Sequence, residues 1–292
     1  MNIPPNGKGK PQNSSRLKFS VAMSVYKNDD PEYFKDSLNS ILNQTFEPDE
    51  IVLVIDGPIP GELRQTIQFY VAKNKCIKPI WFETNKGLGE ALRIAVENCQ
   101  NNLIARMDSD DISVPERFEK QIKLFEKNPN LSVVGSNICE FIGSIENVIG
   151  IREVPQENDQ IKDFLRKRCP FNHVTVMFKK DEVLKVGNYQ DWFWNEDYYL
   201  WIRMYINGAV FQNLEESLVY VRVGEEMYQR RGGWSYFLSE AKLQKYMLEK
   251  GVIGSPLFLF NVMLRFLMQV MIPNKIRGFL FRKVARVKPG KT

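Results

Sequence analysis

Three aspartates crowd into one short stretch of the chain, directly after an apolar run. Residues 103–105 read Leu-Ile-Ala, and Asp108, Asp110 and Asp111 follow. Side chains alternate along an extended segment, so Asp108 and Asp110 should project to the same side, with Asp111 at the bend. Crowded carboxylates repel one another unless a cation joins them, and oxygen donors without His or Cys favour Mg²⁺ or Mn²⁺, which also bind phosphate. The alternative is a solvated turn that caps a helix beginning at Pro115.

The apolar pattern around this stretch alternates between strand-like and helix-like segments. Short apolar runs predict buried strands at residues 19–25, 51–55, 80–82 and 103–105. Helical spacing predicts helices at residues 31–42, 63–71, 88–96 and 115–125. Such alternation is typical of an α/β protein with a mostly parallel sheet covered on both faces. Ligands bind these sheets beyond the carboxyl ends of the strands, and here three strands end at Tyr26, at Asp56 and at the aspartates.

After residue 135 the pattern is looser. Apolar runs predict further strands at residues 174–178 and 218–223, and residues 197–206 are predicted to form a helix that ends at Asn207-Gly208. The only histidine, His173, precedes the first of these strands. One histidine excludes His-rich metal sites and any relay that needs two.

The motifs together resemble family 2 glycosyltransferases of the GT-A fold, a Rossmann-like nucleotide-diphospho-sugar transferase fold, from about Phe19 to Arg286. Those that carry the resemblance are Val25-Tyr26, residues 40–46 (SILNQTF), Asp56-Gly57, residues 85–89 (NKGLG), Asp108–Asp110, and Arg117 with Gln121. Later motifs are similar to a narrower group, the bacterial transferases of O-antigen and amylovoran-type exopolysaccharide assembly: residues 172–177 (NHVTVM), 196–201 (EDYYLW) and 230–234 (RRGGW). That group includes enzymes that add galactose to N-acetylglucosamine on a diphospho-undecaprenol carrier.

The resemblance implies a role for each matching position. Asp56 would hold the uracil ring of a UDP-sugar, Asp108 would contact the ribose or the metal, and Asp110 would bind Mn²⁺ or Mg²⁺. Asp197 would be the general base of an inverting transfer, with Glu196 as the competing candidate. The remaining donor-binding candidates are Tyr26, Gly87, Arg106, Arg230 and Arg231, and the acceptor-binding candidates are His173 and Trp194. The family commonly has an asparagine where this chain has Arg93, so no role is assigned to that position.

Each of these positions also has a structural interpretation. Asp56 can be a turn residue before Gly57, and Asp197 can cap the helix that follows it. His173 can be a hydrogen-bonded core or loop residue, and Arg230 with Arg231 can form a solvated basic turn. The tryptophans at 192, 194 and 201 can simply be core or pocket wall.

Charge is distributed unevenly along the 292 residues. The chain has a net charge of +5, but residues 1–18 and 273–292 contain eleven cations and no acid, so the body carries −6. A nucleic-acid-binding protein normally carries its basic charge on the folded domain. The basic ends instead favour binding to an anionic membrane surface. The four cysteines are far apart without a C-x-x-C pair, and the N-terminus has no apolar signal segment, which predicts free thiols in a reducing compartment.

Residues 257–272 are apolar except for Asn261, Arg265 and Gln269, which recur every four residues. On a helix this spacing makes one narrow polar stripe. The segment would span about 24 Å, short of a hydrocarbon core of about 30 Å. We therefore expect an interfacial helix on the membrane, and the alternative is a helix that packs on the domain or on a second copy in a homodimer.

The sequence thus predicts three regions: a disordered basic tail at 1–18, a catalytic domain at 19–250, and an amphipathic helix with a basic membrane-associating tail at 251–292. Within the catalytic domain, residues 19–135 would bind the nucleotide sugar and residues 136–250 the acceptor. The predicted activity is transfer of a sugar, galactose being favoured, from a UDP-sugar to a polyprenyl-diphosphate-linked acceptor at the cytoplasmic face of the inner membrane. Two alternatives are a sugar nucleotidyltransferase, although residues 25–28 lack the Gly-rich phosphate loop of that class, and a non-catalytic membrane-surface module.

Overall fold

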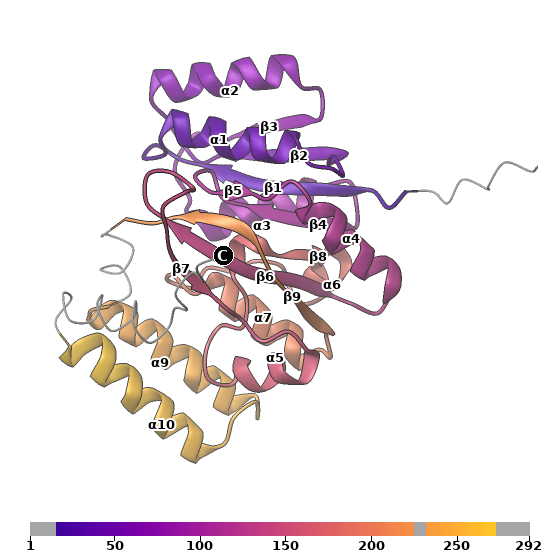
Figure 1. Ribbon diagram of the computed structural model, residues 1–292. Helices are drawn as coiled ribbons and strands as arrows, with labels where there is room; N and C mark the ends of the chain where they lie inside the picture. Colours follow the sequence, from indigo (N-terminus) through magenta and orange to yellow (C-terminus); the bar gives the residue numbers. More distant parts are fainter. Residues whose placement is uncertain (1–15, 225–231, 273–292) are drawn as a thin grey trace, which may run out of the picture.

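The computed structural model describes residues 16–224 and 232–272. Its centre is a nine-stranded sheet in the order β3-β2-β1-β4-β8-β6-β9-β5, with β7 paired to β6 (Figure 1). The strands are β1 (Phe19–Val25), β2 (Glu50–Ile55), β3 (Ile77–Trp81), β4 (Leu103–Met107), β5 (Ile112–Ser113), β6 (Val133–Phe141), β7 (Val148–Arg152), β8 (Met177–Lys179) and β9 (Phe211–Arg222). The helices around it are α1 (Pro31–Leu42), α2 (Gly61–Lys73), α3 (Leu88–Asn98), α4 (Arg117–Lys127), α5 (Asn158–Leu165), α6 (Lys180–Lys185) and α7 (Glu196–Ile206).

The first four strands of the sheet are parallel, as the sequence predicts. β1 pairs in parallel with both β2 and β4, and β2 pairs in parallel with β3. The chain therefore runs outward from β1 through β2 to β3 and then returns to the other side of β1 as β4. This reversal of strand order lies between β1 and β4, and α/β sheets bind their ligands beyond the carboxyl ends of the strands at such a point. Beyond β4 the sheet becomes mixed, because β8 is antiparallel to both β4 and β6.

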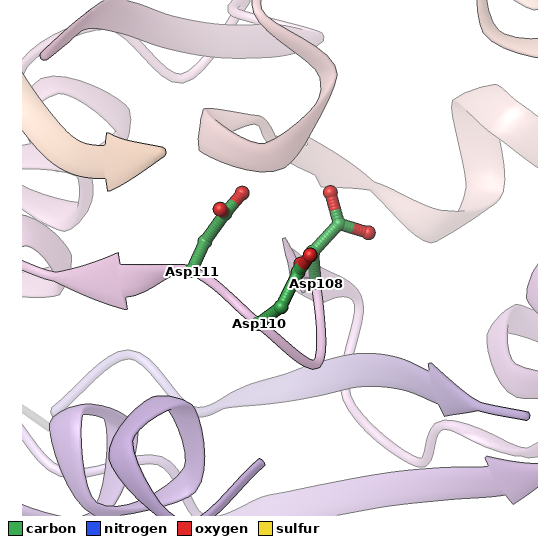
Figure 2. Close-up of side chains that lie close together, drawn as sticks. All are labelled: Asp108, Asp110 and Asp111. Atoms are coloured by element: carbon green, nitrogen blue, oxygen red, sulfur yellow. The ribbon is translucent and has the colours of Figure 1, made fainter. Parts of the chain in front are cut away.

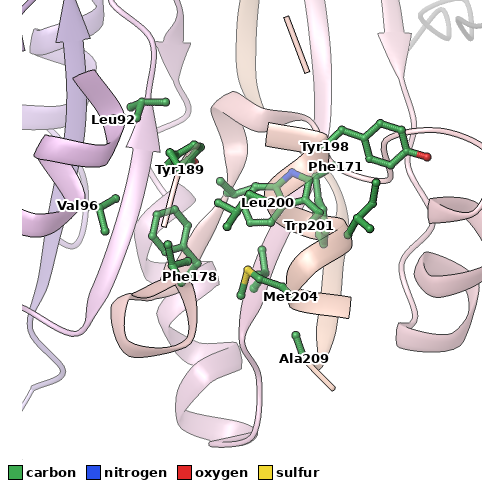
Figure 3. Packing of buried hydrophobic residues seen from close by; sticks show 14 of the residues in the cluster. Leu92, Val96, Phe171, Phe178, Tyr189, Tyr198, Leu200, Trp201, Met204 and Ala209 are labelled. Atoms are coloured by element: carbon green, nitrogen blue, oxygen red, sulfur yellow. The ribbon is translucent and has the colours of Figure 1, made fainter. Parts of the chain in front are cut away.

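Alternate residues of the central strands enter two separate cores. In β2, for example, Ile51, Leu53 and Ile55 pack beneath α1, α2 and α4, whereas Val52 and Val54 pack against α3 and α7. This period of two explains why the strands read as continuous apolar runs: both faces are covered. In the second core Trp201 of α7 is fully buried, and its ring lies 5.3 Å from that of Phe171 (Figure 3).

One of the predicted strands is partly wrong. Residues His173–Thr175 form a 3₁₀ helix, η1, and the strand β8 begins only at Met177. Thr175 donates its hydroxyl to the carbonyl oxygen of Asn172 (2.8 Å), and its backbone N–H bonds the same oxygen (2.9 Å). These local bonds hold the backbone in a turn and compete with strand pairing. The strand predicted at 218–223 is the second half of the longer strand β9.

A helical hairpin follows β9 at the edge of the molecule that lies farthest from α2 (Figure 1). It consists of α9 (Trp234–Glu249), α10 (Ser255–Phe266) and a π-helical turn, η2 (Leu267–Met271). The polar stripe predicted in this segment faces the protein, because Asn261, Arg265 and Gln269 are all less than 9% exposed. The described helices include none with the length and apolar character needed to cross a bilayer.

Candidate active site

The acidic loop between β4 and β5 brings three carboxylates together, as the sequence predicts. Ligand atoms of Asp108, Asp110 and Asp111 all lie within 4.8 Å of one another, on the same side of the loop (Figure 2). Burial, followed by the charge of Asp108, raises the pKa of Asp110 to about 7. Burial and the charge of Asp110 likewise raise the pKa of Asp111. Asp111 is buried, whereas Asp108 is partly exposed and Asp110 is exposed. An all-oxygen set of crowded carboxylates that remains open on one side fits a hard divalent cation, which would relieve their repulsion.

Three elements hold the acidic loop in place. From β9, Arg222 donates its backbone N–H to Asp111 Oδ1 (2.9 Å) and its Nε to the carbonyl oxygen of Asp110 (3.2 Å). From α1, Ser37 donates its hydroxyl to the carbonyl oxygen of Asp108 (2.6 Å). Arg106, at the end of β4, forms an ion pair with both carboxylate oxygens of Asp108. The loop is therefore positioned before any ligand binds.

Arg106 occupies the centre of the site. It is 3% exposed, and its Nε–H has no hydrogen-bond partner among the described residues. Burial is the largest single effect and lowers its pKa, but the charges of Asp108, Tyr189 and Asp111 and the hydrogen bond to Asp108 together outweigh it, so the pKa of Arg106 is raised overall. Its positive charge also lowers the pKa values of Glu196 and Asp197, and this partly offsets the rise that burial causes. One buried cation therefore acts on both sets of carboxylates.

Asp29 belongs to the site although sequence reasoning missed it. It lies just beyond the end of β1, where its Oδ2 accepts the hydroxyl of Ser109 (2.7 Å) and the backbone N–H of Tyr26 (3.0 Å). Burial raises the pKa of Asp29 to about 6, and the charge of Asp108 adds to that effect. Its position three residues after Tyr26, at the carboxyl edge of the sheet, is the signal that could have found it.

Asp56, at the end of β2, organises the loop that leads into α3. Its carboxylate accepts the Nδ2 of Asn85 (2.8 Å) and the backbone N–H groups of Lys86 (2.7 Å) and Gly87 (2.9 Å). Gly57 has φ +90°, and a Cβ there would lie 2.5 Å from the backbone nitrogen of Asn85, so only glycine fits. The predicted uracil-binding aspartate is thus also the residue that fixes the adjacent loop.

Glu196 and Asp197 stand side by side in the first turn of α7. Burial, followed by the charge of Asp197, raises the pKa of Glu196 to about 7, and burial raises the pKa of Asp197. Asp197 accepts the thiol of Cys169, with Sγ 3.6 Å from Oδ2. A Cβ on Gly89 would lie 3.6 Å from the Cβ of Glu196, so the first turn of α3 packs directly against this pair. The pair therefore lies next to the loop that Asp56 holds.

The aromatic candidates occupy different environments. Trp194 is 50% exposed, has φ +55° and stacks on Phe193 with ring centroids 4.7 Å apart. A strained backbone of this kind is typical of functional sites, and Phe193, which sequence reasoning missed, is 49% exposed. Trp201 is core and Trp192 packs on Tyr199. The structure therefore leaves the Phe193–Trp194 pair accessible directly before Glu196.

His173 is partly buried in η1 and is hydrogen-bonded to another side chain. Its Nε2 is 2.8 Å from the hydroxyl of the buried Tyr189, and burial with the nearby charge of Arg106 lowers the pKa of the imidazole. Arg93, where the family commonly has asparagine, pairs with Glu90 and Glu97 along α3. Arg230 and Arg231 lie outside the described residues. The four cysteines are free thiols, as predicted.

A family model described as Glycosyl transferase family 2 matches residues 20–187, more than half of the chain. The chain belongs to glycosyl transferase family 2. It is 38% identical over 269 residues to the amylovoran biosynthesis glycosyltransferase AmsE of Erwinia amylovora, which covers 91% of this chain and 98% of that protein. It is 35% identical over 269 residues to a UDP-Gal:alpha-D-GlcNAc-diphosphoundecaprenol beta-1,3-galactosyltransferase of Escherichia coli, covering 92% of this chain and 97% of that protein.

Solved structures agree on the fold. Residues 1–349 of S. aureus TarS, in complex with UDP-GlcNAc, match with a TM-score of 0.64 at 18% identity, covering 86% of this chain and 73% of that one. The mannosyltransferase PcManGT of Pyrobaculum calidifontis, in complex with GDP-Man and Mn²⁺, matches with a TM-score of 0.60 at 13% identity, covering 90% and 72%. The fold is therefore GT-A-like. The chain is a glycosyltransferase, and neither alternative from the sequence, a nucleotidyltransferase or a non-catalytic module, is supported.

Proposed function

We propose that this glycosyltransferase is a metal-dependent, inverting enzyme that transfers a sugar from a UDP-sugar to a lipid-linked acceptor of the GlcNAc-diphospho-undecaprenol type. Galactose is the favoured sugar, and O-antigen or exopolysaccharide assembly is the favoured context. The similarity to the E. coli galactosyltransferase over most of both chains supports this substrate pair. Residues 19–135 would bind the donor and residues 136–250 the acceptor.

One observation carries the proposal: two sets of carboxylates converge on the buried Arg106. Arg106 forms an ion pair with Asp108 of the acidic loop, and its positive charge also lowers the pKa values of Glu196 and Asp197. Transfer from an activated sugar needs both functions, because one set must hold the leaving diphosphate and the other must accept the proton of the acceptor hydroxyl. A nucleotide-binding module without catalysis would need only the first set.

Each set has residues suited to its task. Asp108 and Asp110 would hold Mn²⁺ or Mg²⁺, which when bound neutralises the charge that develops on the leaving diphosphate. Asp56, Tyr26 and Gly87 would contact the nucleotide, and Arg230 with Arg231 would meet its phosphates. Arg106 stabilises the negative charge of the donor side and keeps Asp108 oriented.

Asp197 is our candidate base, with Glu196 as the competitor. Either carboxylate could take the proton from the acceptor hydroxyl as that oxygen attacks the anomeric carbon from the face opposite the diphosphate. A base works best with a pKa near the working pH. The pKa of Glu196 is raised to about 7, and burial shifts the pKa of Asp197 in the same direction. The exposed Phe193–Trp194 pair offers an apolar platform for the acceptor sugar. His173, whose Nε2 lies 2.8 Å from the hydroxyl of Tyr189, would be a second acceptor-binding residue.

The acceptor sets the location of the reaction. A polyprenyl-diphosphate carrier is anchored in a membrane, so the enzyme would act as a peripheral protein at the cytoplasmic face of the inner membrane. The basic segment 273–292 supports attraction to anionic lipid.

A substrate screen tests the proposal. The purified enzyme is incubated with Mn²⁺, a panel of UDP-, GDP- and dTDP-sugars, and a short-chain polyprenyl-diphosphate-GlcNAc acceptor, and the products are analysed by mass spectrometry and NMR. We expect one hexose to be added from UDP-galactose, with the anomeric configuration inverted. Transfer only from GDP- or dTDP-sugars, or retention of configuration, would contradict the proposal.

A further inference from the structure

The polarity of α10 and η2 is the reverse of that of an ordinary surface helix. Their polar residues are buried: Asn261 is 2% exposed, Arg265 8% and Gln269 7%. Six of their large apolar residues face outward together with two from α9, whereas Leu257 and Phe258 pack against the core. This outer face comprises Trp234, Leu238, Leu259, Phe260, Met263, Leu264, Leu267 and Met271, each between 44% and 65% exposed. Contiguous exposed apolar surface of this kind marks a site that binds something.

A polar seam fixes this orientation. Arg265 donates Nε to Glu240 of α9 (2.5 Å) and an Nη to the carbonyl oxygen of Lys167 (2.6 Å). Gln269 donates to the same Glu240 carboxylate (2.9 Å), and Asn261 donates to the carbonyl oxygen of Arg166 (2.9 Å). Rotating the helix to bury its apolar side would leave Arg265 and Glu240 unpaired, which costs several kcal/mol. The outer face is therefore held outward.

The charges beyond the hairpin indicate what covers the outer face. No acidic residue follows Glu249. Apart from Arg265, which is paired with Glu240, eight cations lie between residues 250 and 292: Lys250, Lys275, Arg277, Arg282, Lys283, Arg286, Lys288 and Lys291. Two copies meeting through this face would bring two such sets of cations together. An anionic bilayer would instead attract them while its acyl chains covered the apolar side chains.

We propose that the outer face of the α9–α10 hairpin inserts into the headgroup region of an anionic bilayer. This inference rests on the proposed function for its purpose, because it would deliver a lipid-linked acceptor to the site. The same α9 that bears Trp234 and Leu238 also holds the segment ahead of Glu196: the Ser239 hydroxyl donates to the carbonyl oxygen of Phe193 (2.6 Å) and accepts Asn195 Nδ2 (3.2 Å). The helix α9 would therefore contact the bilayer through Trp234 and Leu238 and the segment before the candidate base through Ser239.

Vesicle flotation of the full chain tests the proposal without any acceptor. The vesicles contain phosphatidylcholine alone or with about a quarter phosphatidylglycerol. We expect binding to the anionic vesicles that weakens with added salt, because exposed charges are screened. Leu259→Gln/Met263→Gln leaves the charge unchanged but removes apolar area, so the partition coefficient should fall roughly tenfold or more. Phe69→Gln, a residue of similar exposure (53%) on α2, is the matched control and should bind as the wild type does.

Two further measurements separate the outcomes. Equilibrium sedimentation reports the oligomeric state: a wild-type dimer that Leu259→Gln/Met263→Gln makes monomeric, without vesicle binding by either, would show that a second copy covers the face and would overturn the proposal. Equal vesicle binding by wild type and double variant would overturn it too. If the double variant unfolds early, Met271→Gln, a single change at a 61% exposed position, replaces it. Mn²⁺-dependent UDP binding, measured without vesicles, tests the proposed function separately.

Discussion

Two buried arginine–carboxylate pairs, in different regions of the molecule, have different surroundings. Arg106 and Asp108 meet at the carboxyl edge of the sheet, with side chains 4% and 34% exposed, whereas Arg265 and Glu240 join the two hairpin helices at 10% and 13%. Around Asp108 lie further carboxylates with raised pKa values, and Arg106 keeps an unpaired Nε–H. Around Glu240 the neighbours are donors: Gln269 and Tyr236. The first pair is open and carries surplus negative charge, and the second is closed and satisfied.

The comparison shows how one kind of ion pair can serve two purposes. Repulsion within a crowded, open carboxylate site lowers the stability of the folded protein, and binding of a cationic ligand restores it. A closed pair with all partners present mainly fixes how two elements are oriented, although its loss leaves a buried charge. Substitutions around Arg106 and Asp108 should therefore change catalytic activity, whereas substitutions of Arg265 or Glu240 should change the free energy of unfolding.

The largest effect is expected at Asp110. Asp110→Asn removes a metal-binding oxygen, so transfer and Mn²⁺ binding should both be lost. Without metal, the variant should be at least as stable as the wild type, because the charge of Asp110 is repelled by Asp108 and Asp29. Enzyme assays, Mn²⁺ titration calorimetry and thermal unfolding measure the three quantities. Asp159→Asn, which changes an exposed aspartate on α5, should alter none of the three quantities. If Asp110→Asn keeps full activity, Asp110 is not a metal ligand.

The next largest effect separates the two base candidates. Asp197→Asn should lower kcat by about 10²–10⁴-fold and leave the dissociation constant of the UDP-sugar nearly unchanged, since a general base acts only in the transition state. Glu196→Gln should lower kcat less. Single-turnover kinetics measures the rate of transfer, and donor titration measures the dissociation constant of the UDP-sugar. If Glu196→Gln loses turnover while Asp197→Asn keeps it, the two roles are exchanged.

Sequence alone predicted that the aspartates of the acidic loop cluster, and it predicted the hairpin only in part. The acidic loop and Asp56 were singled out because each follows an apolar run, whereas Glu196 and Asp197 were assigned by the resemblance to family 2 glycosyltransferases. Asp29 and Arg222 were missed because their partners are far away in sequence: Ser109 lies 80 residues from Asp29, and Asp111 lies 111 residues from Arg222. Contacts of that range leave no periodic signal.

The hairpin shows a different limit. The four-residue spacing of Asn261, Arg265 and Gln269 predicted a polar stripe, but periodicity does not say whether a stripe faces water or protein. Glu240, the partner that turns the stripe inward, lies on another helix. Similarly, the apolar run at 174–178 favoured a strand, and the hydroxyl of Thr175 changed the outcome through a bond to Asn172.

A medium effect is expected from the closed pair. Arg265→Leu leaves the Glu240 carboxylate buried without its cation, so the free energy of unfolding should fall by about 3–5 kcal/mol. Adding Glu240→Leu should recover much of this loss, because an apolar pair of similar volume is tolerated there. Urea unfolding measures both variants. Lys245→Leu, which breaks the exposed pair with Glu249 at 3.7 Å, is the control and should cost at most about 1 kcal/mol; an equal loss in both single variants would mean that the seam does not fix the hairpin.

The smallest effect is a pH dependence that belongs to the open region. The pKa of Glu196 is about 7 in the folded protein, against an ordinary glutamate value of 4.5. Between these two pH values the folded state therefore binds more protons than the unfolded chain. The free energy of unfolding should therefore decrease as pH rises through this window, by on the order of 2 kcal/mol. Urea unfolding at several pH values in EDTA measures the slope. Glu196→Gln should make the slope shallower without abolishing it, because the raised pKa values of Asp29 and Asp110 contribute in the same window, whereas Glu157→Gln, at an exposed position before α5, should leave it unchanged. If Glu196→Gln keeps the wild-type slope, the carboxylate is already ionised at low pH, and the crowding that distinguishes the open region from the hairpin does not extend to α7.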